Sequence, residues 1–423
     1  MTSKVHIGCG AGFAGDRFDA CLPVLSALAK HDGPRYLIFE VLAERTLALA
    51  QQIRRGDPDR GYSPYLDHYL SNALGPAMAS GVRIVSNMGA ANPLGAARRA
   101  HVLAHDLGLR APKIAVVTGD DLAEVMSESE IREAPTLEGT DFAGRSLIAA
   151  NAYLGARPVA EALATAADIV LVGRTTDSAL VLGPLIHEFG WEERDWDRLA
   201  AGTVAGHLLE CGAQATGAYF ADPGKKDVPD LARVGFPIAE IASGGEMTIT
   251  KPKGTGGCVT TATVTEQLLY EMHDPAAYLA PDVTADITEV HLEDDGSDRI
   301  TVKGVRGHPA PPTLKATICV ENGWLGEAEI SYAGPNALAR ARLAGEVVAE
   351  RLSLRGVNHA PRVEVIGAGS VLLGGSPQDA SPDGDYRTRV ALLAETREAA
   401  QMVADEVLSL LCSGPAAGGG VRS

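Results

Sequence analysis

Short apolar runs alternate with helix-like segments through the first half of the chain. The runs that predict strands are residues 5–8, 36–40, 82–87, 114–119 and 168–173. Several of them, such as YLIF, IAVV and DIVLVG, are almost entirely apolar, which is typical of parallel strands buried on both faces. Helical periodicity occurs between them, at residues 42–54, 94–107 and 159–167. This alternation predicts an α/β fold with a doubly wound, mostly parallel sheet.

The pattern changes from about residue 285 onward. Short strands are predicted at residues 287–293, 299–304, 313–321, 327–332, 362–366 and 386–395, and helices at 335–354 and 396–412. This order predicts a smaller α+β domain with an antiparallel sheet. We therefore expect an α/β domain over residues 1–284, an α+β domain over 285–412 and a flexible Gly-rich tail over 413–423. Alternatively, the tail is a glycine loop that returns to a site or a neighbouring subunit.

Composition narrows the class of protein. Of the 423 residues, 46% are apolar and 22% are charged, as in folded soluble proteins. No window approaches the ~18 consecutive apolar residues of a membrane span, and the N-terminal MTSKVHIG lacks a signal-peptide pattern. The formal net charge of -17 argues against a nucleic-acid partner but leaves room for a small anionic ligand. We expect a cytoplasmic protein that binds neither membrane nor nucleic acid.

The six cysteines are scattered and form no CxxC pair. They predict neither a zinc ribbon nor a disulfide framework, and the sequence identifies no metal-ligand set and no cofactor.

The first predicted strand runs into a glycine loop, IGCGAGFAGDR. The spacing Gly10-x-Gly12-x-x-Gly15 matches a dinucleotide fingerprint, but Asp16 and Arg17 follow where a clean apolar helix should start. Three interpretations stay open: an NAD or FAD site, a substrate or anion loop that uses Gly10 and Gly12, and a purely structural turn.

The ends of the other predicted strands also carry polar residues. Ligands of open parallel sheets bind at the carboxyl ends of the strands, so we expect substrate-binding residues there. The candidates are Glu44, Asn87, Asn92 and Arg174. In GRTTDS, Arg174 and Asp177 offer a carboxylate clamp and a general acid or base in one loop, although Asp177 could instead cap the next helix.

Two further segments could contribute to a site. On a helix, GHLLECG places His207, Glu210 and Cys211 on one side, as acid–base groups and a possible nucleophile; the alternative is a buried Cys and an exposed Glu. A metal at these residues would need ligands from elsewhere. In ITKPKGTGG, Lys251 precedes a turn at a predicted helix start, so we expect an anion anchor or else merely a sharp turn. That turn comprises Gly254, Thr255, Gly256 and Gly257.

Together these stretches resemble the acyclic terpene utilisation (AtuA) family over nearly the whole chain. The resemblance is carried by IGCGAGFAGDR, LAERTLALAQ, SNMGAANP, IVLVGRTTDSALVLGPLIHEFGW, AGHLLECGAQATG and ITKPKGTGGCVTTATVTEQLLYE. It implies a connection with the degradation of citronellol and geraniol through CoA thioesters, and a small ferredoxin-like module or partner protein. It assigns no catalytic residues.

The functional expectation is an enzyme that acts on an acyl-CoA or a small carboxylic acid, as a lyase or hydratase (dehydratase). Asp177, His207 and Glu210 would be the acid–base groups, with Arg174, Lys251 and the glycine amides as the anchor. The alternatives are a non-catalytic acyl-CoA-binding or scaffolding subunit of a carboxylase-associated complex, and a nucleotide-dependent oxidoreductase. A homo-oligomer is expected only because symmetric assemblies are common among soluble enzymes.

Overall fold

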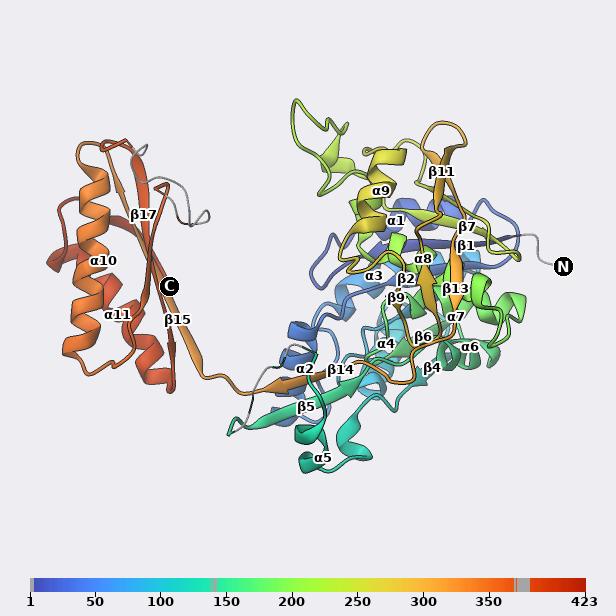
Figure 1. Cartoon of the computed structure of the whole chain (residues 1–423), viewed down its shortest axis with the longest axis horizontal. Helices are drawn as coiled ribbons and strands as arrows, with labels where there is room; N and C mark the ends of the chain where they lie inside the picture. Colours follow the sequence, from blue (N-terminus) through green and yellow to red (C-terminus); the bar gives the residue numbers. More distant parts are fainter. Residues whose placement is uncertain (1–3, 138, 140–141, 143, 369, 371–380) are drawn as a thin grey trace. The chain divides into compact units, whose positions relative to one another are not determined.

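The computed structural model describes residues 4–137, 139, 142, 144–368, 370 and 381–423 (Figure 1). The chain divides into two compact units, Met1–Val320 and Glu321–Ser423. This corrects the predicted boundary between residues 284 and 285. The reason is strand pairing: β12 (Arg299–Lys303) pairs with β8 (Met247–Thr250), and β14 (Ala316–Val320) pairs with β5 (Leu147–Ala152).

A nine-stranded sheet forms the centre of unit 1, in the order β11-β12-β8-β7-β1-β2-β3-β6-β4. All residues of β6 are buried, as are all but the first of β2 and β3, as the uninterrupted apolar runs predict. The five predicted strands are confirmed as the parallel part, which comprises β1 (Lys4–Ala11), β2 (Arg35–Phe39), β3 (Arg83–Ser86), β6 (Ile169–Val172) and β4 (Ile114–Val117). Beyond β1 the sheet continues antiparallel through β7 (Ile238–Ala242), β8, β12 and β11 (His291–Asp294).

Helices cover the sheet in two groups. Moving outward from β1, the connections contain α1 (Cys21–Leu28), α3 (Leu66–Ser80) and α4 (Pro93–Asp106), and also α2 (Glu44–Gly56), which packs on β5. On the return from β4 they contain α6 (Arg157–Ala164), α7 (Ala179–Phe189) and α8 (Trp196–Glu210). Because crossovers between parallel strands are right-handed, reversing the direction of travel moves the helices to the other face. This is the doubly wound arrangement that the sequence predicts.

Smaller elements complete unit 1. They are α5 (Glu128–Glu133), α9 (Thr261–Leu269) and a three-stranded sheet of β9 (Tyr278–Leu279), β10 (Thr284–Asp286) and β13 (Arg306–His308). The three-stranded sheet packs on α8. Within the described residues, no helix is long and apolar enough to cross a membrane.

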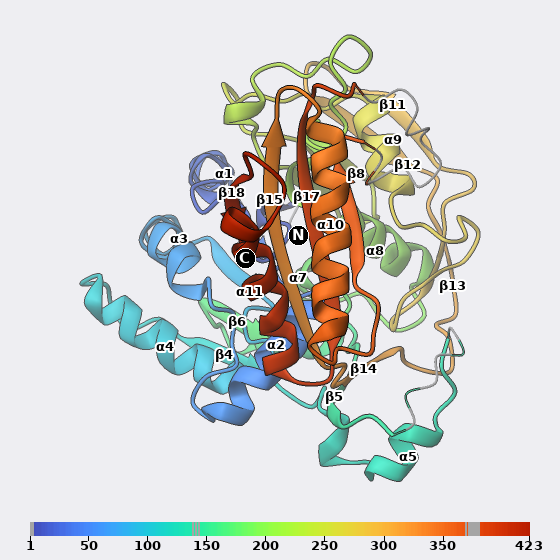
Figure 2. The same ribbon diagram turned by 90° about the vertical axis from the view of Figure 1, so that its left-hand side faces the viewer.

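Unit 2 is an α+β domain with an antiparallel sheet. Its element order is β15 (Trp324–Ala333), α10 (Ala337–Leu354), β16 (Arg362–Ile366), β17 (Asp385–Ala394), α11 (Arg397–Ser413) and β18 (Gly419–Arg422). The strand order is β16-β17-β15-β18, the arrangement of a ferredoxin-like βαββαβ fold. Both helices lie on one face of the sheet (Figure 2). The predicted flexible tail is corrected, because its end forms β18 and pairs with β15.

Candidate functional site

A cavity of about 460 Å³ lies at the carboxyl edge of the parallel strands in unit 1. Its wall includes Ala14 after β1, Val41 and Leu42 after β2, and Ala90 after β3, together with residues of α2. Most of the lining side chains are apolar, and the volume is within the range of small-molecule pockets. The cavity is therefore where ligands of open parallel sheets are expected to bind.

A buried polar network holds the cavity wall formed by Val41 and Leu42. The Asn87 side chain accepts a hydrogen bond from the Val41 amide at 2.8 Å and donates one to Glu40 Oε1 at 2.8 Å. The Leu42 amide donates to the same Glu40 oxygen at 3.0 Å. Glu40 and Asn87 are 8% and 0% exposed. Asn87 thus positions this wall from behind rather than facing a substrate.

Arg174 belongs to the same network and is 1% exposed. Its guanidinium donates to the carbonyls of Leu42 and Thr175 and to the Asp177 carboxylate. All three bonds are internal, so the predicted role of Arg174 as a substrate anchor is corrected: it orients Asp177. The Asp177 side chain is 37% exposed, and it does not cap α7, whose N-cap residue Ser178 makes no side-chain cap.

The carboxyl groups of this region have raised pKa values. Burial, with the Asp177 charge nearby, raises the pKa of Glu40 to about 8. Loss of water contacts also raises the pKa of Asp177, although Arg174 opposes this effect. The carboxyl groups of this region have few positive charges near them, so ionising all of them at once is unfavourable. The site can therefore hold a proton on a carboxyl group near neutral pH, which acid–base catalysis requires.

The Glu44 side chain contacts Tyr153 and Lys315, two residues that the sequence did not point to. The Tyr153 hydroxyl donates to Glu44 Oε1, and Lys315 Nζ lies 3.3 Å from the same oxygen. Two cations lie close to the Tyr153 ring, with Arg174 Cζ 4.4 Å and Lys315 Nζ 4.6 Å from its centroid. Tyr153 follows the buried β5, so the strand-end rule could have found it had β5 been recognised. Only the pairing of β5 with β14 reveals Lys315.

His207 and Glu210 form a buried pair at the end of α8. His207 Nδ1 lies 3.1 Å from Glu210 Oε1, and the side chains are 2% and 11% exposed. Gly206 brings α8 close to α7, because a Cβ there would lie 2.5 Å from Ser178 Cα. Among the described residues, several buried polar atoms lack a hydrogen-bond partner, including His207 Nε2, Glu210 Oε2, Ser178 Oγ and Gln267 Oε1. Buried polar groups are normally satisfied, so this cluster favours a polar ligand.

Cys211, at the end of α8, does not fit the predicted nucleophile. Burial, with the negative charge of Glu210, raises the pKa of its thiol to about 12. The thiolate is the nucleophilic form, and at neutral pH this thiol stays protonated. Cys211 is therefore a neighbour of the His207–Glu210 pair.

The glycines at the end of β1 and directly after it serve close packing. A Cβ on Gly12 would lie 2.2 Å from the Gly212 amide nitrogen, and one on Gly10 would lie 2.6 Å from the Phe39 ring. The Gly12 amide already donates to Asp16 Oδ2 at 2.9 Å. An acidic group on this amide opposes a bound pyrophosphate, so the geometry favours the structural interpretation over the dinucleotide and substrate-loop ones.

The predicted anchor at Lys251 is also corrected. Its side chain is 4% exposed, and its Nζ donates to the Thr255 carbonyl at 2.9 Å and lies 3.2 Å from Asp298. The amides of Gly256 and Gly257 donate to backbone carbonyls, at 2.8 and 2.7 Å. Lys251 and the amides of Gly256 and Gly257 are thus already paired, which argues against the predicted anion anchor, and Gly254 lies in the turn.

Asn92 has a structural role in place of the predicted binding role. Its Oδ1 accepts from the Gly95 amide at 2.9 Å and caps α4, while its Nδ2 donates to the carbonyls of Pro58 and Arg60. These bonds use both amide protons of the side chain.

Comparison with known proteins gives one family. The model of the acyclic terpene utilisation family protein AtuA matches residues 5–423. Neither the curated proteins nor the solved structures include a significant match to this chain.

Proposed function

This chain belongs to the acyclic terpene utilisation family AtuA, and we propose that it is a hydro-lyase acting on a small carboxylic acid or its CoA thioester. The observation that carries the proposal is the state of Asp177. This carboxyl is partly exposed at the carboxyl edge of the parallel strands, is oriented by a buried guanidinium and has a raised pKa.

Removal of water from a hydroxy acid needs a base and an acid. The base takes a proton from the carbon next to the carbonyl, and the acid protonates the departing hydroxyl. The C–H and C–O bonds break, a carbon–carbon double bond forms and water leaves. Asp177 is the proposed base, and the His207–Glu210 pair supplies the proton. Ser178, next to Asp177, packs against Gly206, next to His207, which supports the closeness of the two groups.

Glu40 and Arg174 are proposed as positioning residues, since both are buried. Arg174 holds the Asp177 carboxyl in place, and Glu40 is close enough for the Asp177 charge to raise its pKa. They set the proton affinity of Asp177 without needing to touch the substrate.

Substrate binding is proposed to use the apolar cavity for the carbon chain and Lys315 for the anionic group. The Lys315 side chain is 53% exposed, unlike Arg174 and Lys251, so an anion can reach it. The family description names acyclic terpenes, and an acid with an apolar acyclic chain would suit this cavity.

We further propose that the protein works in the cytoplasm. All six cysteines are free, which suits a reducing compartment. Because unit 2 has a ferredoxin-like fold of its own, the proposal needs no separate partner of that kind. A homo-oligomer stays an expectation that light scattering of the purified protein would test.

The test starts from a thermal-shift screen with acyl-CoAs, hydroxy and unsaturated acids, and NAD(P)H, because a ligand that prefers the folded state raises the unfolding temperature. Turnover of the acid or acyl-CoA that binds is then compared between the wild type and Asp177→Asn. The variant should lose turnover and keep its unfolding temperature. Asp195→Asn, which changes an acid paired with Arg198 at the start of α8, is the matched control and should keep turnover.

Two results would contradict the proposal. Binding without turnover by the wild type would favour a scaffolding subunit. Stabilisation by NAD(P)H alone would favour an oxidoreductase.

A further inference from the structure

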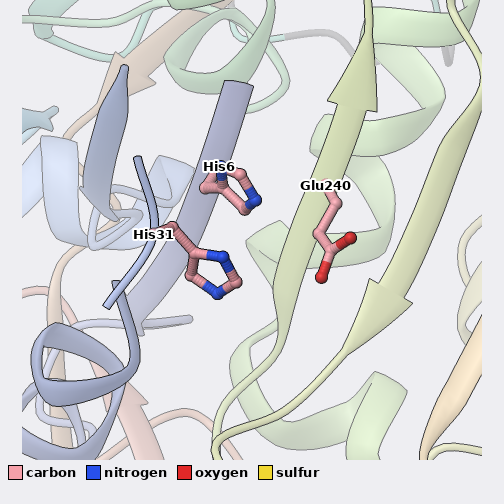
Figure 3. Close-up of side chains that lie close together, drawn as sticks. All are labelled: His6, His31 and Glu240. Atoms are coloured by element: carbon pink, nitrogen blue, oxygen red, sulfur yellow. The ribbon is translucent and has the colours of Figure 1, made fainter. Parts of the chain in front are cut away.

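Two histidines and a glutamate from three segments of unit 1 meet on one face of the sheet. His6 of β1 is directly opposite Glu240 of β7 in the antiparallel register, so their side chains point to the same face. His31, from the turn after α1, stacks on His6 with ring centroids 4.1 Å apart. Figure 3 shows the His6 ring directed toward Glu240, with His31 beside it. One potential ligand atom from each residue lies within 4.8 Å of the other two.

We propose that His6, His31 and Glu240 bind one divalent transition-metal ion, with Zn²⁺ as the best chemical match. Two imidazoles and a carboxylate are a common ligand set for such ions. In a tetrahedral zinc site the ligand atoms lie about 2.1 Å from the ion and roughly 3.4 Å from one another. Ligand atoms that are up to 4.8 Å apart must therefore approach by up to roughly 1.4 Å to close this site around zinc. His31 lies in a turn and is only partly buried, so it can make that movement.

The state of His6 supports a ligand role. It is 7% exposed, and its Nδ1 has no hydrogen-bond partner among the described residues. Buried polar groups are normally hydrogen-bonded, so an unpaired ring nitrogen at this place favours a bound ligand.

The charges around Glu240 define how the site would work. Arg299 donates hydrogen bonds to both carboxylate oxygens, at 2.9 and 3.0 Å. These bonds hold the carboxylate in place, as residues behind a metal ligand commonly do. Lys4 lies 3.3 Å from Oε2 and its side chain is 45% exposed, so it can swing into solvent when a cation binds. Arg35 adds a further positive charge near His6. Metal binding must therefore displace Lys4, and removing Lys4 should strengthen it.

The proposed role is structural. The site lies near the amino end of β1, and at about 3.3 Å per residue the strand from His6 to Ala11 spans roughly 17 Å toward the cavity edge. A bound ion would join β1, β7 and the turn after α1.

The experiment titrates Zn²⁺ into the full chain by calorimetry, after EDTA treatment and removal of any purification tag. We expect about one ion to bind, with affinity lowered roughly tenfold or more in His31→Ala and raised in Lys4→Ala. His105→Ala is the matched control, because this histidine of α4 has an 89% exposed side chain. It should leave zinc affinity unchanged.

Thermal unfolding gives a second readout that does not depend on activity. Zn²⁺ should raise the unfolding temperature of the wild type and of His105→Ala but not of His31→Ala. His31 is preferred to the buried His6 because its replacement is better tolerated by the fold. Absence of zinc binding, or equal binding by the wild type and His31→Ala, would overturn the proposal.

Discussion

Replacing Glu40 by Gln is expected to stabilise the protein near neutral pH, by an amount that depends on pH. In the folded chain Glu40 is buried, and its pKa rises from an ordinary 4.5 to about 8. The folded state therefore keeps a proton that the unfolded chain releases. Gln carries no such proton and can still accept the hydrogen bonds from Asn87 and Leu42 that Glu40 Oε1 accepts.

The size of the effect follows from proton linkage. One pKa unit corresponds to about 1.4 kcal/mol. In the unfolded chain, pH 7 is roughly 2.5 units above the pKa of Glu40, so the side chain is ionised, whereas in the folded chain it stays protonated. This difference lowers the free energy of unfolding at pH 7 by about 3 kcal/mol. Because the pKa is raised on folding, the favourable contribution of Glu40 is complete below about pH 4.5. It is lost as the pH rises toward about 8.

The assay is urea unfolding of the wild type and Glu40→Gln at about pH 5, 7 and 8.5. Trp191 lies in unit 1 and is 3% exposed, so its fluorescence reports unfolding of the unit that contains Glu40. Trp324 lies in unit 2, and a Trp324→Phe background removes its signal. The advantage of the variant should be small at about pH 5, about 3 kcal/mol at pH 7, and larger at pH 8.5.

Glu240→Gln is the control of opposite sign. Hydrogen bonds from Arg299, and the charge of Lys4, lower the pKa of Glu240 to about 2, so Glu240 stabilises the fold above about pH 4.5. In EDTA this variant should lose up to about 3 kcal/mol at pH 7, with the loss shrinking below about pH 4.5. If Glu40→Gln were destabilised at pH 7, or if its effect did not vary with pH, the assignment of a protonated Glu40 would be wrong.

Three further outcomes are expected. Gly12→Ala should lower the free energy of unfolding in denaturant by about 1–3 kcal/mol, because its Cβ would clash with backbone atoms. Gly56→Ala places its Cβ in open space and should not lower it. Equal effects of the two substitutions would contradict the packing role of Gly12. Lys315→Met should raise KM severalfold with little change in kcat, and an unchanged KM would remove Lys315 from substrate binding. A fragment ending at Val320 should show a cooperative unfolding transition by circular dichroism. A fragment ending at residue 284 should not, because it lacks β12 and β14. If the shorter fragment folded, the domain boundary would lie between residues 284 and 285 after all.

Local pattern determined most of the first sheet. Uninterrupted apolar runs identify β1, β2, β3, β4 and β6, because strands buried on both faces need apolar residues at every position. The runs in β5, LIAANA, and β8, MTIT, are short and carry small or polar residues, so periodicity does not separate them from loops. Missing β5 also concealed Tyr153.

The candidate site was likewise predictable only in part from the sequence. The rule that ligands bind at strand ends found Asn87, Arg174 and Asp177 from the sequence alone. Whether each group was free for a substrate depended on partners distant in sequence. Arg174 donates to the carbonyl of Leu42, and Lys251 pairs with Asp298.

The sequence by itself determined the fold class, the parallel strands and the family, because these depend on short-range periodicity and on recognisable motifs. The tertiary structure alone decided which cations are accessible, which carboxyl groups hold a proton, and that His6, His31 and Glu240 converge. Burial and charge neighbours set a group's availability and pKa. In this sheet, residues that become neighbours come from distant parts of the chain. Their contacts form only when the strands pair.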